Sequence, residues 1–131
     1  MVAGGYIVND VSCDEYYFDK DIDFFVANPA TGNTKSFEVK WCEKISQTGN
    51  LFLEIHNPRS KQWNGDGWWP HCQADYLVYG DAINKKFYCF PLLELRQRIK
   101  DMNLRYARTW DYSEGWLLPL EDVKDLSITI E

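Results

Sequence analysis

The chain has 131 residues, of which 45% are hydrophobic and 16% aromatic, and its net charge is -6. This length and composition predict one domain over residues 1–131 with its own core, and they exclude a disordered chain. The acidic balance argues against indiscriminate coating of nucleic acid, but not against a nuclease whose acids hold a metal ion. Because the sequence shows neither a membrane-length apolar run nor a signal-peptide pattern, we expect a cytoplasmic protein without membrane contact.

The first elements expected in chain order are a short strand over 6–8 and a short helix over 12–18 capped by Ser12, followed by strands over 20–28 and 35–42 that a hairpin turn joins. A polar loop over 43–50, a strand over 51–56 and a long irregular segment over 57–70 come next. The rest of the chain is expected to form strands over 74–79 and 86–90, a helix opened by Pro91, a strand over 116–118 and a β-like end over 126–130. One helix among many strands predicts an α+β, or mixed α/β, sheet domain. The four cysteines form no CxxC pair, which favours reduced, buried thiols over a zinc site or disulfides.

Residues 35–42 alternate between polar and apolar side chains, so Glu38 and Lys40 share one face of the expected strand. In the preceding strand, Asp21 and Asp23 share a face by the same period. Both strands are apolar enough to lie inside a sheet, where charged groups are costly unless they are paired or bound to metal. A carboxylate followed one strand later by Glu-x-Lys is what a phosphodiesterase that uses a divalent cation needs.

This arrangement of Asp23 with Glu38-Val39-Lys40 resembles the PD-(D/E)xK signature of the restriction-endonuclease-like nuclease superfamily. The likeness extends over residues 15–125, and in this range the chain resembles small phage-type and Holliday-junction-resolvase-like members of the superfamily. It is carried further by residues 48–54, by residues 74–79, by the helix start at 90–95 and by residues 118–120. The resemblance implies a mixed central β-sheet flanked by few helices and a nuclease that hydrolyses phosphodiester bonds in DNA.

Carried over by position, the resemblance makes Asp23 and Glu38 ligands of Mg²⁺, which Mn²⁺ could replace, and Lys40 the catalytic lysine. The main-chain carbonyl of Val39 would be a further ligand. Asp21 competes with Asp23 for the first role because both point to the same face, and Asp23 is preferred because it lies deeper in the apolar strand. Further residues that could contribute to the site are Glu15, Glu54 and Gln73.

Two departures from the family pattern bear on assembly. No proline precedes the aspartate, and the helix that opens the family core is short or missing, since barely twenty residues precede Asp21. A sheet face left uncovered in this way predicts a homodimer. The basic residues expected to contact DNA phosphates are Arg59, Lys61, Arg96, Arg98 and Lys100.

Several alternatives stay open from the sequence alone. Glu38 and Lys40 could be an exposed pair on an edge strand, where lysine discourages aggregation. Trp63, Trp68 and Trp69 could stack on exposed bases or anchor their loop to the core. The chain could be a catalytically inactive nucleic-acid-binding or protein-interaction module on the same scaffold, or an aromatic-rich ligand-binding β domain.

Overall fold

The computed structural model describes residues 2–3, 5–14, 16, 20–42 and 44–130, which form two β-sheets with few helices. The strands are β1 (Val2–Ala3), β2 (Tyr6–Asp10), β3 (Phe24–Ala27), β4 (Thr34–Trp41), β5 (Asn50–His56), β6 (Tyr76–Asp81), β7 (Lys86–Pro91), β8 (Arg105–Arg108), β9 (Glu114–Pro119) and β10 (Ile128–Ile130). The helices are α2 (Ile45–Thr48), α3 (Leu92–Ile99) and two short 3₁₀ turns, η1 (Leu120–Asp122) and η2 (Lys124–Leu126). The chain is therefore of the α+β class.

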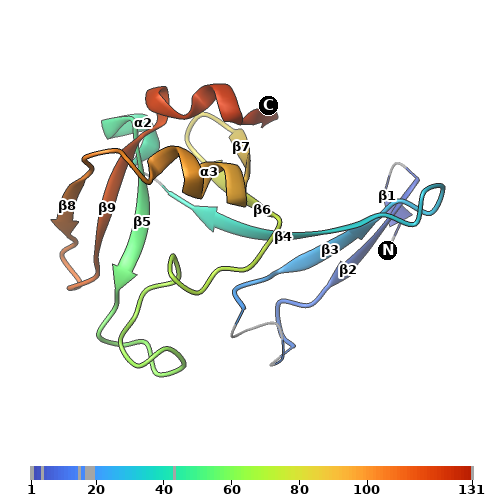
Figure 1. Cartoon of the computed structure of the whole chain (residues 1–131), viewed down its shortest axis with the longest axis horizontal. Coiled ribbons are helices and arrows are strands. Elements are labelled where there is room, and N and C mark those ends of the chain that lie inside the picture. The colour runs from blue at the N-terminus through green and yellow to red at the C-terminus, as the bar shows by residue number, and fades with distance from the viewer. Residues whose placement is uncertain (1, 4, 15, 17–19, 43, 131) are drawn as a thin grey trace.

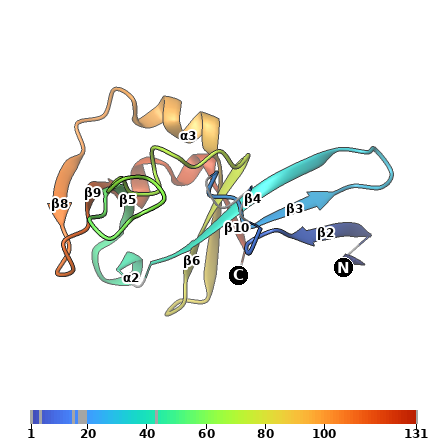
Figure 2. The same ribbon diagram turned by 90° about the horizontal axis from the view of Figure 1, so that it is seen from below.

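The larger sheet has the strand order β1-β2-β3-β4-β6-β7-β10, and the smaller one has the order β5-β9-β8. Strands β4 and β6 are parallel, whereas the other neighbours are antiparallel, so the larger sheet is mixed. The ends of β2, β3 and β4 project from the body as an arm, and the smaller sheet lies at the opposite end of the molecule (Figures 1 and 2).

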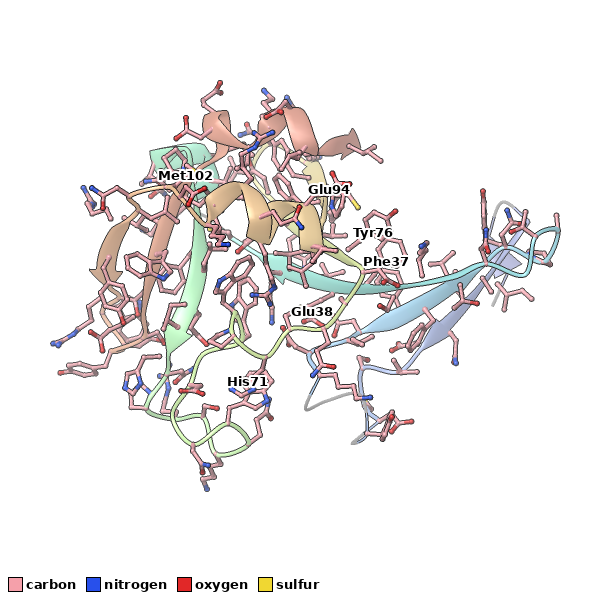
Figure 3. The ribbon with its side chains drawn as sticks, in the orientation of Figure 1. Phe37, Glu38, His71, Tyr76, Glu94 and Met102 are labelled. Carbon is pink, nitrogen blue, oxygen red and sulfur yellow. The ribbon has the colours of Figure 1, made fainter. Side chains whose placement is uncertain are left out.

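The pairing of β4 with its two neighbours places three aromatic rings in a row. Phe24 lies opposite Phe37, and Phe37 lies opposite Tyr76. Their ring centroids are 5.2 and 5.1 Å apart, and the rings are stacked (Phe37 and Tyr76 are labelled in Figure 3). Because side chains alternate along a strand, Glu38 and Lys40 occupy the other face of the sheet, as the sequence pattern predicts.

The core lies between the smaller sheet, the larger sheet and α3. Leu51, Leu53 and Leu118 of the smaller sheet pack in the same buried cluster as Leu92 and Leu95 of α3. Pro91 precedes this helix with a φ of -61°, which suits a helix start and confirms the expected opening. The helix ends at Ile99.

The structure differs from the sequence-based expectation in several elements. The strand expected over 20–28 comprises only Phe24–Ala27, since Asp21 has a φ of +54°, which takes the backbone out of the extended region. The polar loop expected over 43–50 contains α2, which ends at Gly49 with a φ of +73° and a bond from its amide to the Ile45 carbonyl. Strand β8 was not expected, and the helix expected over 12–18 falls partly outside the described residues.

The larger difference concerns the sheet itself, because a single central sheet was expected. Strand β5 does not join the larger sheet but pairs with β9 along Asn50–His56. Gly115 on β9 allows this close pairing, since a Cβ there would lie 2.2 Å from the Leu53 carbonyl oxygen. The second sheet contributes Glu54 to the pocket around Lys40, and the loop after β5 contributes Trp63 and Trp68.

Candidate functional site

The candidate site lies where the ladder between β3 and β4 ends and the backbone before β3 turns away. Asp23 joins the two segments there: its amide donates to the Phe37 carbonyl at 2.9 Å, and its carboxylate Oδ2 accepts the Val39 amide at 2.9 Å. Asp23 is therefore both a structural link between the strands and an acid facing the pocket that Asp21, Glu38 and Lys40 also line.

Lys40 is at the centre of this pocket. Its Nζ lies 3.1 Å from Asp21 Oδ1 and 3.1 Å from Glu38 Oε1. The same ammonium lies over the indole of Trp68, 4.7 Å from the ring centroid, where a cation–π contact adds to the ion pairs. Glu38 is only 4% exposed, which is contrary to the alternative of an exposed edge-strand pair. Figure 3 shows its position between β4 and the loop that carries His71.

The environment of these groups perturbs their pKa values in a consistent way. Burial raises the pKa of Glu38 to about 8, and the nearby charges of Asp21 and Asp23 act in the same direction against the attraction of Lys40. Burial likewise raises the pKa of Asp21. Burial acts to lower the pKa of Lys40, but the combined attraction of Asp21 and Glu38 outweighs it and the pKa is raised. Lys40 is therefore a cation throughout the neutral range.

Two carboxylate oxygens in the pocket have no hydrogen-bond partner. Asp21 Oδ2 and Glu38 Oε2 are both buried and no donor group contacts them, and the two carboxyl groups lie close enough to share a proton with each other. A buried polar atom of this kind is costly, so the pair is suited to a ligand that brings positive charge. Hard divalent cations bind through carboxylate oxygens, and Mg²⁺ commonly takes only one or two of them alongside water and phosphate oxygens. The donor set therefore fits Mg²⁺ or Mn²⁺.

The wider set of acids does not form a closed metal cage. Within the described part of the chain, no three His, Cys, Asp or Glu side chains gather as a ready metal site. Glu54 of β5 lines the same pocket, and burial raises its pKa. Gln73 is exposed, and its main-chain N–H donates to the Lys20 carbonyl at 2.8 Å. Glu15 lies outside the described residues.

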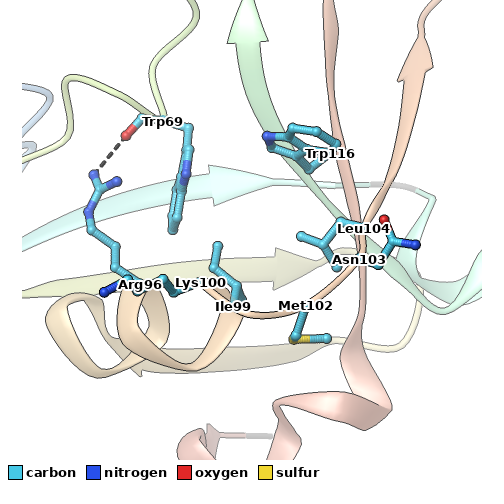
Figure 4. Close-up of a pocket in the computed structure, with 8 residues that line it drawn as sticks. All are labelled: Trp69, Arg96, Ile99, Lys100, Met102, Asn103, Leu104 and Trp116. Atoms are coloured by element: carbon cyan, nitrogen blue, oxygen red, sulfur yellow. Dashed lines mark hydrogen bonds between the residues drawn. The ribbon is translucent and has the colours of Figure 1, made fainter.

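None of the basic residues expected to contact DNA lines this pocket, and three of them bind other parts of the chain. Arg59 pairs with Asp111 at 2.7 Å, and Arg98 makes a two-bond pair with Asp125 at 2.9 Å. Arg96 donates to the carbonyls of Trp69 and Cys72 at 2.7 and 2.9 Å, as Figure 4 shows for Trp69. The two others, Lys61 and Lys100, are exposed.

The long segment after β5 covers the pocket with tryptophan. Trp68 and Trp69 are buried, so they anchor this segment to the core as well as contacting Lys40 and Arg96. Trp63 stacks on His71 with ring centroids 5.0 Å apart. Gly67 permits this segment to pass close to the main chain of β5, because a Cβ at this position would lie 2.4 Å from the Glu54 carbonyl oxygen. The sequence left open whether these tryptophans stack on bases or anchor their loop, and it did not predict that Trp68 covers Lys40.

Fold and site together define a small α+β domain with two sheets and a buried pocket that holds a lysine between carboxylates. Comparison of the chain with family models, with curated proteins and with solved structures returned no match. None of the described helices is both long and apolar enough to span a membrane.

Proposed function

We propose that the protein is a metal-dependent nuclease that hydrolyses phosphodiester bonds in DNA, with a site of the PD-(D/E)xK, restriction-endonuclease-like type. The observation that carries this proposal is the half-buried Lys40, held 3.1 Å from both Asp21 and Glu38 beside two buried carboxylate oxygens that no donor group contacts. Charged groups withdrawn from water are costly to the fold, and functional sites are where such arrangements concentrate.

In the proposed site, Glu38 and an aspartate from the segment before β4 would hold Mg²⁺ or Mn²⁺, with the Val39 carbonyl as a further ligand. Asp23 is the aspartate ligand that the sequence favours. Its carboxylate also accepts a hydrogen bond from the Val39 amide, which fixes the part of β4 that carries Glu38 and Lys40. Asp21 is the competing choice, because its unpaired oxygen is buried in the same pocket as that of Glu38. The bound cation would supply a more acidic water and charge neutralisation at the phosphate.

Lys40 would orient the attacking water and counter the negative charge that develops on the phosphate oxygens. Its ammonium is suited to this because its two carboxylate neighbours keep it protonated. The indole of Trp68 and the loop around it limit access of bulk water to the ammonium, which strengthens its electrostatic effect.

The test is Mg²⁺- or Mn²⁺-dependent cleavage of DNA by the purified protein, with a chelator control. Glu38→Gln should abolish cleavage, and Lys40→Met should reduce turnover by about 10²–10³-fold with metal affinity retained, because the lysine is assigned to charge stabilisation. Metal affinity is measured separately by calorimetry. Wild-type cleavage rates in both variants would contradict the proposal, and metal-independent DNA binding without cleavage would favour an inactive binding module.

Asp21→Asn and Asp23→Asn separate the two candidate ligands. The variant that loses calorimetric metal binding identifies the ligand, whereas the other should retain it and lose activity only in part. Circular dichroism of both variants is the control, because Asp23 also links two strands.

The proposal includes a homodimer. The face of the larger sheet opposite Glu38 carries the stacked rings of Phe24, Phe37 and Tyr76. Phe37 and Tyr76 line a hollow of about 430 Å³ together with Val26 and Ile128. An apolar sheet face of this kind is a surface that a second copy can bury, and two-fold pairing is the commonest form of assembly.

A further inference from the structure

A second hollow adjoins the pocket of Lys40 and extends along the smaller sheet. Its volume is about 710 Å³. We call it the Trp110 groove, and the lining residues used below are Lys44, Phe52, Arg105, Arg108, Trp110 and Leu117. Lys40, Glu54 and Trp68 line both this groove and the candidate site, so the groove opens directly beside the carboxylates.

The floor of the groove is one face of the smaller sheet. Phe52 lies opposite Leu117, and Leu117 lies opposite Arg105, so these three residues stand side by side across β5, β9 and β8. The neighbouring pair Tyr106 and Trp116 lies on the opposite face of the smaller sheet, because side chains alternate along a strand. Their rings meet edge to face with centroids 5.1 Å apart. The groove therefore has an apolar floor with a guanidinium at its side.

The rim of the groove combines an exposed aromatic ring with positive charge. Trp110, in the turn between β8 and β9, is 93% exposed, which is unusual for so large an apolar side chain. Arg105, Arg108 and Lys44 are exposed lining residues. Two acids line the groove: Asp111 pairs with Arg59 at 2.7 Å, and Glu54 lies at the end shared with Lys40. Arg108 lies 4.0 Å from Glu114, so the positive charge of the rim beside the indole comes mainly from Arg105 and Lys44.

We propose that the Trp110 groove binds a single strand of nucleic acid, with a base stacked on Trp110 and backbone phosphates beside the basic side chains of the rim. The strand would then run past Phe52 and Leu117 toward Lys40. The further step, that this strand is the substrate and is unpaired at the cleaved position, rests on the proposed nuclease function.

The chemistry of the groove favours a single strand over a duplex. In a duplex the faces of the bases are stacked on one another and are out of reach, whereas unpaired bases stack readily on aromatic side chains. A volume of about 710 Å³ is that of a small-molecule pocket and not of a surface that cradles a double helix. The positive rim complements the phosphates, and the apolar floor complements the base faces.

The test measures binding in a chelator, where no cleavage is needed, by fluorescence anisotropy of labelled oligodeoxythymidine of about 12 nucleotides, a length within the range bound by one single-strand site. A blunt duplex of equal length should bind at least about tenfold more weakly. Trp110→Ala should weaken single-strand binding by about 5- to 100-fold, since one stacked base is lost. Arg105→Gln and Arg108→Gln should each weaken the salt dependence of binding. The slope of the logarithm of the binding constant against the logarithm of salt concentration should become shallower by about 0.7.

Leu93→Ala and Lys124→Gln are the matched controls, because Leu93 is 70% exposed and Lys124 is exposed, and neither residue lines the groove. Both controls should bind like the wild type. Equal affinity for single strand and duplex, an unchanged affinity of Trp110→Ala, or equally tight binding of an oligoglutamate peptide would each overturn the inference. Specific binding without cleavage in Mg²⁺ or Mn²⁺ would instead remove the nuclease proposal, and with it the role of the strand as substrate.

Discussion

At the scale of the residue, the pair of Glu38 and Lys40 places charged groups where the fold buries them. Glu38 is almost fully buried beside two other acids, and a single ammonium offsets their charge. In the absence of a bound cation, the ionised form of Glu38 is therefore disfavoured. A protein that evolved only for stability would place an uncharged side chain here.

This reasoning predicts how stability depends on pH. The folded protein holds the Glu38 proton up to a pKa of about 8, whereas an unfolded chain releases it near the ordinary value of 4.5. The folded state binds more protons over that interval, so its stability falls as pH rises from about 4.5 to about 8. Glu38→Gln should flatten this dependence, and at pH 8 it should be more stable than the wild type by roughly 1–3 kcal/mol.

Urea unfolding at several pH values, in a chelator, measures this effect. Glu94→Gln on α3 is the control, because this side chain is exposed and should leave the pH dependence unchanged. A Glu38→Gln variant that is less stable than the wild type at pH 8 would show that the carboxylate is stabilised by its surroundings, contrary to the expected direction.

At the scale of the element, α3 carries two arginines whose contacts differ in kind. The guanidinium of Arg96 stacks on Trp69, 4.2 Å from the ring centroid, and donates to two carbonyls of the loop that covers the site. That of Arg98 pairs with Asp125 at the surface. The helix is therefore joined to the loop by Arg96 and to the C-terminal turns by Arg98.

Arg96→Ala should lower the free energy of unfolding by about 2–3 kcal/mol, since it removes two charged hydrogen bonds and a cation–π contact and leaves carbonyls unpaired. Arg96→Lys should recover only part of this loss, because an ammonium lacks the planar fork. Arg98→Ala is the matched control and should cost less, because its ion pair is exposed to water. Equal losses at both positions in urea unfolding would show that Arg96 does not fasten the loop.

At the scale of the whole molecule, the arm formed by β2, β3 and β4 extends from the body (Figure 1). The stacked rings of Phe24, Phe37 and Tyr76 lie on one face of the sheet to which the arm belongs. If the proposed dimer buries this face, light scattering at micromolar concentration should give about twice the 15.4 kDa mass of the chain. Phe37→Glu should return the mass to that of one chain, because a carboxylate would be buried unpaired at the interface. A monomeric wild type would contradict this part of the proposal.

Much of the local structure could be predicted from the sequence. The alternation over residues 35–41 correctly separated the aromatic face from the face of Glu38 and Lys40, and the pair of strands around residues 82–85 forms the antiparallel pair β6 and β7. Pro91 and the spacing of Leu92 and Leu95 predicted α3 and its buried side. These features depend on the period of side chains along one element, which the sequence states directly.

The partners of the elements could not be predicted in the same way. A period of two says which side chains share a face, but it does not say which strand lies alongside, because that choice depends on hydrogen bonds between segments far apart in the chain. Hence the sequence did not reveal that β5 pairs with β9 and β8 in a separate sheet. Strand β8 was missed because three of its four side chains are exposed and it has no clear apolar face.

The candidate site combines both kinds of information. The sequence by itself determined that Glu38 and Lys40 lie on one strand face, with aspartates on the segment before it. Only the tertiary structure decided that the ammonium of Lys40 binds Asp21, whose φ is positive, and not Asp23. Only the tertiary structure decided, too, that Trp68 covers this ammonium from a loop almost thirty residues later in the chain. The physical reason is that residue spacing determines direction along an element, whereas burial and pairing depend on what the rest of the chain packs against it.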